Sequence, residues 1–163
     1  MSAHGFEVAG WGRGLLHYAE GMLVDLDEPA ARTRTASPGP PPRGAEALVE
    51  RLAAYLRGEP IDFADVDRRA AYTWFGLTPL ACQLLEVVCS IPRGETASYG
   101  EVAALAGHPG AARAAGAACG RGPLSIIVPY HRVIRGDGTI GMYGELGVER
   151  KRRLLELEGA RAR

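Results

Sequence analysis

Residues 98–120 read SYGEVAALAGHPGAARAAGAACG, and this stretch predicts two short helices joined by a tight link. Ser98 and Glu101 have the spacing of a capping box, in which two residues satisfy each other's backbone amides at a helix start. Gly107 is the expected end of the first helix, because glycine readily adopts the left-handed conformation that follows a helix. The run AARAAGAACG after the HPG link gives the second helix, so the pattern predicts a helix-turn-helix.

The second of these helices offers almost nothing that can distinguish one base from another. A helix that reads DNA sequence normally presents Arg, Asn, Gln or Lys side chains to base edges. Here the residues are nearly all Ala and Gly, and Arg113 is the single long side chain. Such a smooth surface suits close approach to DNA, with Arg113 filling the space of a nucleotide rotated out of the duplex. An Ala-rich packing helix with one solvated arginine is the alternative that this helix alone leaves open.

The residues on either side of this stretch predict the other elements of a C-terminal domain. Thr78 is a candidate N-cap and Pro79 suits the first helical position, so a helix is expected through LACQLLEVVCSI. After the helix-turn-helix, LSIIV predicts a buried strand, and VIRGDGTIGMY predicts a hairpin with a tight primed turn at Asp137-Gly138. ERKRRLLELEGA predicts a basic amphipathic helix near the end of the chain.

The first half of the chain predicts a second, smaller domain. GLLHYA and GMLVDL indicate two short strands around a Gly-containing turn, and AEALVERLAAYLRGEP indicates a helix. Residues 32–44 are rich in Pro, Gly and Ser, which predicts a loop with its Pro-rich part at 36–43. We therefore expect an α+β protein, with a smaller α/β domain at 1–75 and a helix-turn-helix domain at 76–163.

Composition and charge set limits on the partners of this protein. Residues 1–75 carry eight Arg against eleven Asp plus Glu, a net −3, whereas residues 76–163 carry eleven Lys plus Arg against eight acids, a net +3. Only the second half is therefore a candidate for meeting a polyanion. The three cysteines have no CxxC spacing, and His4 and His17 are expected at the surface or in turns, so we predict neither a disulfide framework nor a metal site. No apolar run has the length of a membrane span or a signal peptide, and we expect a cytoplasmic protein.

Five blocks in the second half resemble the O6-alkylguanine-DNA alkyltransferase family, also called methylated-DNA–protein-cysteine methyltransferases. They are, in order, IPRGETASYGEVAALAG, HPGAARAAGAACGRGP, SIIVPYHRVI, GDGTIGMYG and RKRRLLELEG. The resemblance covers residues 76–159 most closely, extends through 47–75 and fades before them. It implies a reduced, ribonuclease-H-like N-terminal domain and a winged-helix-like C-terminal domain. It also implies binding to the minor groove of double-stranded DNA that contains O6-alkylguanine, with no cofactor. Arg113 matches the arginine that replaces the everted guanine, and Tyr99 the tyrosine that crowds its phosphate. The implied DNA-binding residues are Thr96, Ser98, Tyr99, Ala112, Arg113 and Gly116, and the implied base pocket is formed by Tyr130, Val133, Tyr143 and Gly144.

The family's chemistry lies in a P-C-H-R-V motif, and here this chain departs from it. The family's cysteine thiolate accepts the alkyl group irreversibly, and a histidine and a distant glutamate activate it. His131 and Glu158 match the histidine and the glutamate, but Tyr130 stands at the position of the cysteine. A second departure is Gly122, where the family often has asparagine. Displacement at an sp³ carbon favours a soft thiolate, with an unperturbed pKa near 8.5, over a phenol with a pKa near 10.

The substitution leaves three functions to distinguish. The chain resembles alkyltransferase-like proteins, which lack the cysteine, bind alkylated DNA without repairing it and pass the lesion to nucleotide excision repair. This leading hypothesis expects a monomer with no catalytic residue. The second hypothesis is an active alkyltransferase with an unusual acceptor, Tyr130 or Cys119. The third is a DNA-binding module without lesion preference. The second helix argues against it, because that helix lacks side chains that can distinguish bases.

Overall fold

The computed structural model describes residues 1–30 and 42–160, and residue contacts divide the chain into two compact units. The first unit contains Met1–Gly76 and Pro123–Ile127, and the second contains Leu77–Gly122 and Val128–Arg163. Most of the predicted Pro-rich segment at 36–43 lies outside the described residues. Within the described ranges, no helix has both the length and the apolar character needed to cross a membrane.

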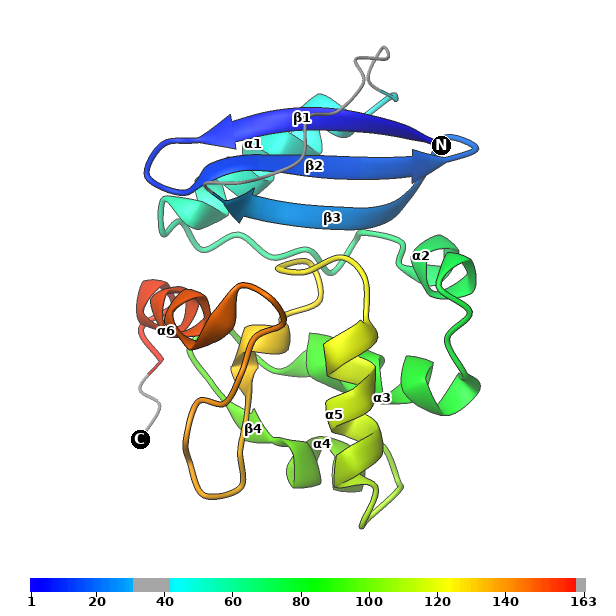
Figure 1. The fold of residues 1–163 in the computed structure, drawn as a ribbon, viewed down its shortest axis with the longest axis vertical. Helices are drawn as coiled ribbons and strands as arrows, with labels where there is room; N and C mark the ends of the chain where they lie inside the picture. Colours follow the sequence, from blue (N-terminus) through cyan, green and yellow to red (C-terminus); the bar gives the residue numbers. More distant parts are fainter. Residues whose placement is uncertain (31–41, 161–163) are drawn as a thin grey trace. The chain divides into compact units, whose positions relative to one another are not determined.

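An antiparallel sheet with the strand order β1-β2-β3 forms the centre of the first unit (Figure 1). Its strands are β1 (Ser2–Val8), β2 (Gly12–Ala19) and β3 (Met22–Ala30). The predicted strand GLLHYA lies within β2, and GMLVDL coincides with β3 from Met22 onward, whereas β1 was not expected from the sequence. Helix α1 (Ala45–Leu56) confirms the predicted helix and lies across one face of the sheet, where Trp11 Nε1 donates to the carbonyl of Leu56. A second, short helix, α2 (Arg69–Trp74), follows it in the chain.

One histidine of this sheet is paired with a carboxylate. His17 lies within β2, not in a turn, and its Nε2 is 3.0 Å from Oδ2 of Asp27 on the neighbouring strand β3. The hydrogen bond to Asp27 raises the pKa of His17 above 6.5, and the nearby charge of Asp25 adds to this, although partial burial opposes it. The pair therefore stabilises the protonated imidazole in the folded state.

We expect this pair to make the stability of the protein depend on pH. Because the folded pKa is raised, the stabilisation is fully present below the unfolded pKa of about 6.5 and is lost as pH rises through the folded value. Urea denaturation of the wild type and of His17→Gln at pH 5.5, 7 and 8.5 should show the largest difference in unfolding free energy at pH 5.5. Asp27→Asn, which keeps the histidine, should lose the same pH dependence. A difference that stays constant with pH would show that the pair does not titrate in this way.

The predicted strand LSIIV is wrong, because the backbone turns there. Leu124 and Ile126 have φ angles of 62° and 74°, which belong to the left-handed region and not to an extended strand. Both side chains are nonetheless buried in the first unit, at 0% and 2% exposure. The amide of Leu124 donates to Oδ1 of Asp25 at 3.1 Å, so a carboxylate of the sheet holds this turn in place. The apolar run thus predicted burial correctly and conformation incorrectly.

The second unit consists of short elements around the predicted helix-turn-helix (Figure 1). They are α3 (Pro79–Ser90), β4 (Ala97–Ser98), α4 (Tyr99–Leu105), α5 (Ala112–Arg121), η1 (Tyr130–Arg132), β5 (Val133–Ile134) and α6 (Gly147–Leu157). Strands β4 and β5 pair in parallel over two residues each. The predicted starts of α3 and α4 are confirmed: Thr78 caps α3 through the amide of Ala81, and Ser98 and Glu101 form both bonds of the capping box.

The turn after β5 differs from the predicted primed type. The amide of Gly138 donates to the carbonyl of Arg135, and the amide of Arg135 donates to the carbonyl of Thr139, both at 3.0 Å. The central residues of the turn are therefore Gly136 and Asp137, neither of which has a positive φ, and Gly138 follows with a φ of 85°. This is a three-residue loop in which a glycine bulge follows an ordinary turn.

Candidate nucleic-acid interface

Tyr99 and α5 meet at a glycine. Tyr99 is the first residue of α4, and a Cβ placed on Gly116 of α5 would lie 3.9 Å from Tyr99 Cδ1, so the ring lies against the helix backbone. Burial raises the pKa of the Tyr99 hydroxyl above 10, which keeps it neutral at physiological pH. The hydroxyl and amide of Ser98, one of the implied DNA-binding residues, are both engaged in the capping box.

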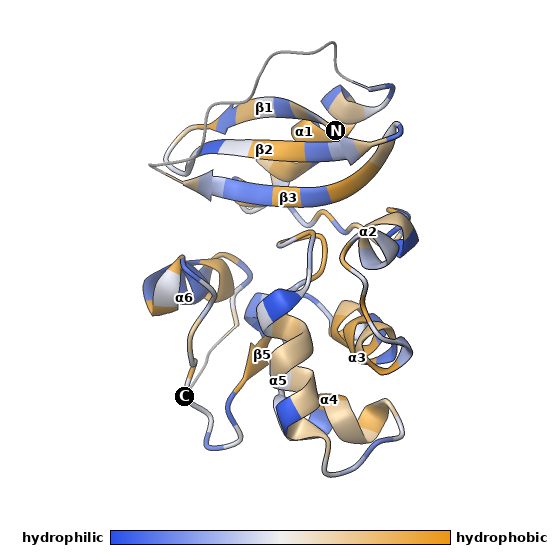
Figure 2. Ribbon diagram, turned by 45° about the vertical axis from the view of Figure 1, so that its right-hand side comes forward, coloured by the Kyte–Doolittle hydropathy of each residue, from blue (hydrophilic) through white to orange (hydrophobic). Residues whose placement is uncertain are grey.

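Helix α5 separates a buried face from a smooth exposed one. Ala115 and Ala118 are buried in the second unit, while Arg113, Ala117 and Gly120 are exposed at positions i, i+4 and i+7 of the same helix face. Figure 2 shows the body of α5 in the pale orange of weakly hydrophobic residues. On the exposed face of α5, only Arg113 therefore has a long side chain, as the sequence predicted. Thr96 and Ala112, also predicted to contact DNA, are partly exposed.

Glu158 stands at the centre of a buried polar network. Its carboxylate accepts two hydrogen bonds from Arg132, from Nε at 3.0 Å and from Nη2 at 2.7 Å. His131 Nε2 lies 3.1 Å from the same carboxylate, and both His131 and Glu158 have fully buried side chains. Arg132 also donates through Nη1 to the carbonyl of Ile91. The structure thus brings together His131 and Glu158, as predicted, and adds Arg132, which the sequence analysis did not identify.

Tyr130 begins η1 and is turned toward the C-terminal end of α5. Its side chain is buried, at 5% exposure. A Cβ placed on Gly122 would lie 2.7 Å from Tyr130 Cζ and closer still to the phenolic oxygen. The phenol group therefore fills the space beside the Gly122 backbone. The two positions at which this chain departs from the family pattern are neighbours in the structure.

The other predicted base-pocket residues lie around η1 and α6. Tyr143 is buried, and its ring is edge-on to that of His131, with centroids 6.5 Å apart at 82°. The carbonyl of Val133 accepts a hydrogen bond of 2.5 Å from Nζ of Lys151, a buried residue of α6 that the sequence analysis missed. Burial lowers the pKa of Lys151 to about 8. Gly144 is exposed and has a φ of 49°.

Cys119 of α5, the alternative acceptor, lies near Lys151. Burial raises the pKa of its thiol to about 12, although the charge of Lys151 acts in the opposite direction. At neutral pH the thiol is therefore almost entirely protonated, and the protonated form is a weak nucleophile.

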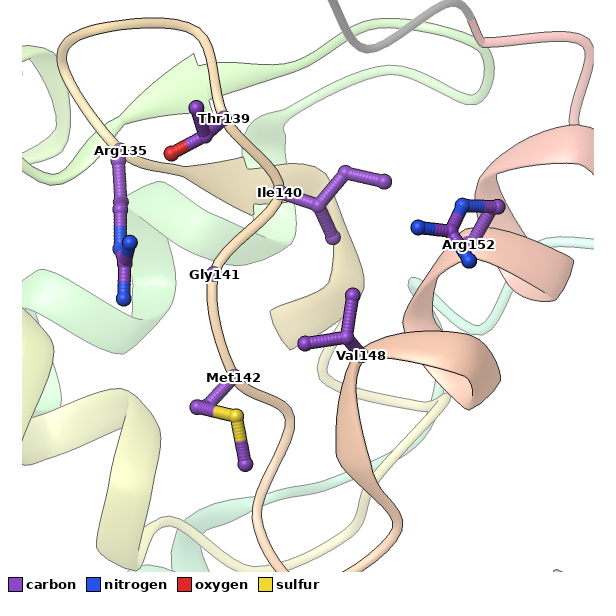
Figure 3. Close-up of a pocket in the computed structure, with 7 residues that line it drawn as sticks. All are labelled: Arg135, Thr139, Ile140, Gly141, Met142, Val148 and Arg152. Carbon is purple, nitrogen blue, oxygen red and sulfur yellow. The ribbon is translucent and has the colours of Figure 1, made fainter.

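An open pocket of about 360 Å³ lies between the loop after β5 and α6 (Figure 3). Its lining residues are Arg135, Thr139, Ile140, Gly141, Met142, Val148 and Arg152. Arg152 also pairs with Glu149 on α6. None of the four predicted base-pocket residues lines this pocket, although Met142 directly precedes Tyr143. Among the described residues, no group of three or more His, Cys, Asp or Glu side chains is placed to hold a metal ion.

Several known proteins are similar to this chain in sequence and fold. Residues 79–160 match the model of the 6-O-methylguanine DNA methyltransferase DNA-binding domain. The chain is 42% identical to the methylated-DNA–protein-cysteine methyltransferase of Mycobacterium tuberculosis over 142 residues, which are 86% of this chain and 79% of the relative. It is 43% identical to the methyltransferase of Methanothermobacter thermautotrophicus, over 73% of this chain and 64% of the relative. The structure of the M. tuberculosis protein OGT in complex with DNA is similar over 99% of this chain and 96% of that chain, with a TM-score of 0.76 and 37% identity.

Proposed function

The chain belongs to the O6-methylguanine DNA methyltransferase family, and from this premise we propose that it binds O6-alkylguanine in double-stranded DNA without accepting the alkyl group. The observation that carries this proposal is the placement of Tyr130. A buried phenol beside Gly122 stands next to His131, at the position where the family pattern has a cysteine. The protein would therefore recognise the lesion and leave it intact.

The chemistry of alkyl transfer disfavours both available acceptors. Displacement at an sp³ carbon needs a soft, ionised nucleophile, and a phenol with an ordinary pKa near 10 is hard and neutral at pH 7. The phenolic oxygen of Tyr130 also lies close to the backbone of Gly122. Cys119 carries the soft sulfur atom that this reaction favours, but its pKa of about 12 leaves almost no thiolate at pH 7.

The surface of α5 supports binding by nucleotide rotation. An exposed face of Ala and Gly can approach a groove closely, and the cation of Arg113 rises from it. In this proposal Arg113 takes the place of the rotated guanine, Tyr99 crowds the phosphate beside it, and Thr96, Ala112 and Gly116 line the contact with the DNA backbone. The rotated base stacks on Tyr143, near Val133 and Gly144.

Recognition without transfer would serve repair by marking the lesion. The complex with DNA, and not a modified protein, would then be the signal, and a nucleotide excision repair system in the same compartment would read it. We propose that a single copy of the protein in the cytoplasm performs this function, because one helix-turn-helix and one base pocket suffice for one lesion.

Two measurements on one pair of duplexes test the proposal. The duplexes are identical except for a single O6-methylguanine, and the protein is titrated onto each, recovered and weighed intact. We expect tighter binding to the lesion duplex and an unchanged protein mass. The M. tuberculosis relative, treated in parallel, should gain about 14 Da if it accepts a methyl group in exchange for a proton.

The second candidate function is an active alkyltransferase. The relatives are named as methyltransferases, and the His131–Glu158 contact is present, which favours it. A stoichiometric gain of about 14 Da, located by peptide mapping on Tyr130 or Cys119, would establish it and refute lesion sensing without transfer. Equal affinity for both duplexes with no adduct would instead indicate a DNA-binding module without lesion preference.

A further inference from the structure

The backbone conformation at position 122 does not require a glycine. It is the C-cap of α5, with φ −71° and ψ 142°, an extended conformation that any residue adopts. Glycine is usually needed where φ is positive, and that reason is absent here. The requirement must therefore come from the space around the residue.

Tyr130 and the backbone of α5 both lie close to that space. A Cβ at position 122 would overlap the phenolic oxygen and would lie 2.7 Å from Cζ of the same ring, shorter than the 3.5–4.0 Å at which carbon atoms attract one another. It would also lie 3.0 Å from the carbonyl oxygen of Ala118, which is fixed within α5, and this is tighter than most contacts that Cβ atoms make. A side chain at position 122 cannot relieve the overlap without displacing a neighbour.

Tyr130 cannot withdraw easily either, because its neighbours in η1 are anchored. His131 is fully buried against Glu158, and Arg132 is held by two hydrogen bonds to the same carboxylate. The main chain of η1 is thus fixed on its C-terminal side by a buried ionic network. The phenol ring extends from this fixed point to the end of α5.

From these contacts we infer that Gly122 and Tyr130 form an interlocking pair, in which the phenol fills the volume of a missing side chain and joins η1 to the C-terminal end of α5. Position 122 must remain glycine as long as position 130 is tyrosine. Conversely, a small residue at position 130 leaves a void beside Gly122. Gly122 therefore leaves the space that the phenol ring of Tyr130 occupies.

A thermal-unfolding cycle on the full chain tests this pair without DNA, so its outcome is independent of the proposed function. Gly122→Ala in the wild type should lower the melting temperature by about 5 °C, the scale of overpacking by a methyl group in a domain of this size. In a Tyr130→Cys background the same methyl group enters a void, so Gly122→Ala should leave the melting temperature unchanged or raise it. This change of sign is the expected signature of the pair.

Gly120→Ala is the matched control for the cycle. Gly120 lies on the same helix, two residues earlier, and a Cβ there would meet no atom within 4 Å. Alanine has the higher helix propensity, so Gly120→Ala should raise the melting temperature equally in both backgrounds.

Tyr130→Phe separates the oxygen from the ring and protects the test against variants that do not fold. Because the oxygen is the closest atom to position 122, Gly122→Ala should cost less in the Tyr130→Phe background than in the wild type. If Gly122→Ala fails to fold, recovery of folding by Tyr130→Phe or Tyr130→Cys supports the pair. The inference is overturned if the effect of Gly122→Ala is the same whatever residue stands at position 130, or if neither substitution restores folding.

Discussion

Glu158→Ala should lower the free energy of unfolding by about 3–5 kcal/mol, the scale for removing one partner from a buried ionic network. The carboxylate accepts two hydrogen bonds from Arg132 and contacts His131, and its side chain is fully buried. Without it, the guanidinium of Arg132 keeps its charge but loses its counterion, because arginine does not deprotonate in proteins. Chemical denaturation monitored by circular dichroism measures the loss.

Glu156→Ala is the control for this experiment. Glu156 lies two residues earlier in α6 and is exposed, so its replacement should change stability by no more than about 0.5 kcal/mol. Similar losses for the two variants would show that the network around Glu158 contributes no more than an ordinary surface carboxylate. A large loss for Glu158→Ala alone would establish that the network holds η1 in place.

Arg113→Ala should weaken binding to a duplex with O6-methylguanine by about 1–3 kcal/mol, or roughly 5- to 150-fold in the dissociation constant. The reason is that Arg113 is the only long side chain on the exposed face of α5 between positions 113 and 120. No neighbour on that face can replace it in the space left by a rotated nucleotide. Affinity for the undamaged duplex should fall much less, so the preference for the lesion should shrink.

Arg121→Ala distinguishes insertion from simple charge attraction. Arg121 is an exposed arginine at the other end of α5, so its loss removes the same charge from the same helix. We expect it to weaken binding to both duplexes by a similar factor, as the loss of a phosphate contact does. If the two arginine variants behave alike on both duplexes, Arg113 contributes charge only, and the nucleotide-rotation model fails.

The elements that the sequence predicted well are those fixed by neighbouring residues. The caps at Thr78 and at Ser98–Glu101 formed as expected, because each is a short-range exchange of hydrogen bonds within one helical turn. The smooth exposed face of α5 was also predictable. Alanine has only a methyl group and glycine has no side chain, so neither has a side-chain conformation that the surroundings could change. Local chemistry was sufficient in these places.

Predictions failed where distant contacts decide the conformation. The run LSIIV has the composition of a strand, but the carboxylate of Asp25, nearly a hundred residues away in sequence, binds the amide of Leu124 and helps hold a turn. Strand β1 was missed because SAHGFEV has a weak alternation, and its pairing with β2 supplies the hydrogen bonds that the sequence does not show. The turn after β5 lies one residue earlier than predicted, because Gly138 adopts its positive φ in the bulge that follows the turn.

Two residues of the candidate site were missed for different reasons. Lys151 had a readable signal: it shares a helix face with Leu154, Leu155 and Glu158, so the period of α6 places it inside. Arg132 had none, because a bidentate bond to Glu158 depends on how η1 and α6 pack. The match between Gly122 and Tyr130 also requires coordinates, since their eight-residue separation contains the turn that the sequence misread.

The discontinuity of the first unit has a consequence for how the chain folds as it is made. Residues Pro123–Ile127 belong to that unit, and they bury Leu124, Ile126 and Ile127. A nascent chain that has emerged from the ribosome only as far as α5 therefore lacks these buried residues of the first unit. Although N-terminal domains usually fold first during synthesis, this one cannot be completed until most of its neighbour has been translated. We therefore expect the two units to complete their folding at nearly the same time, late in synthesis.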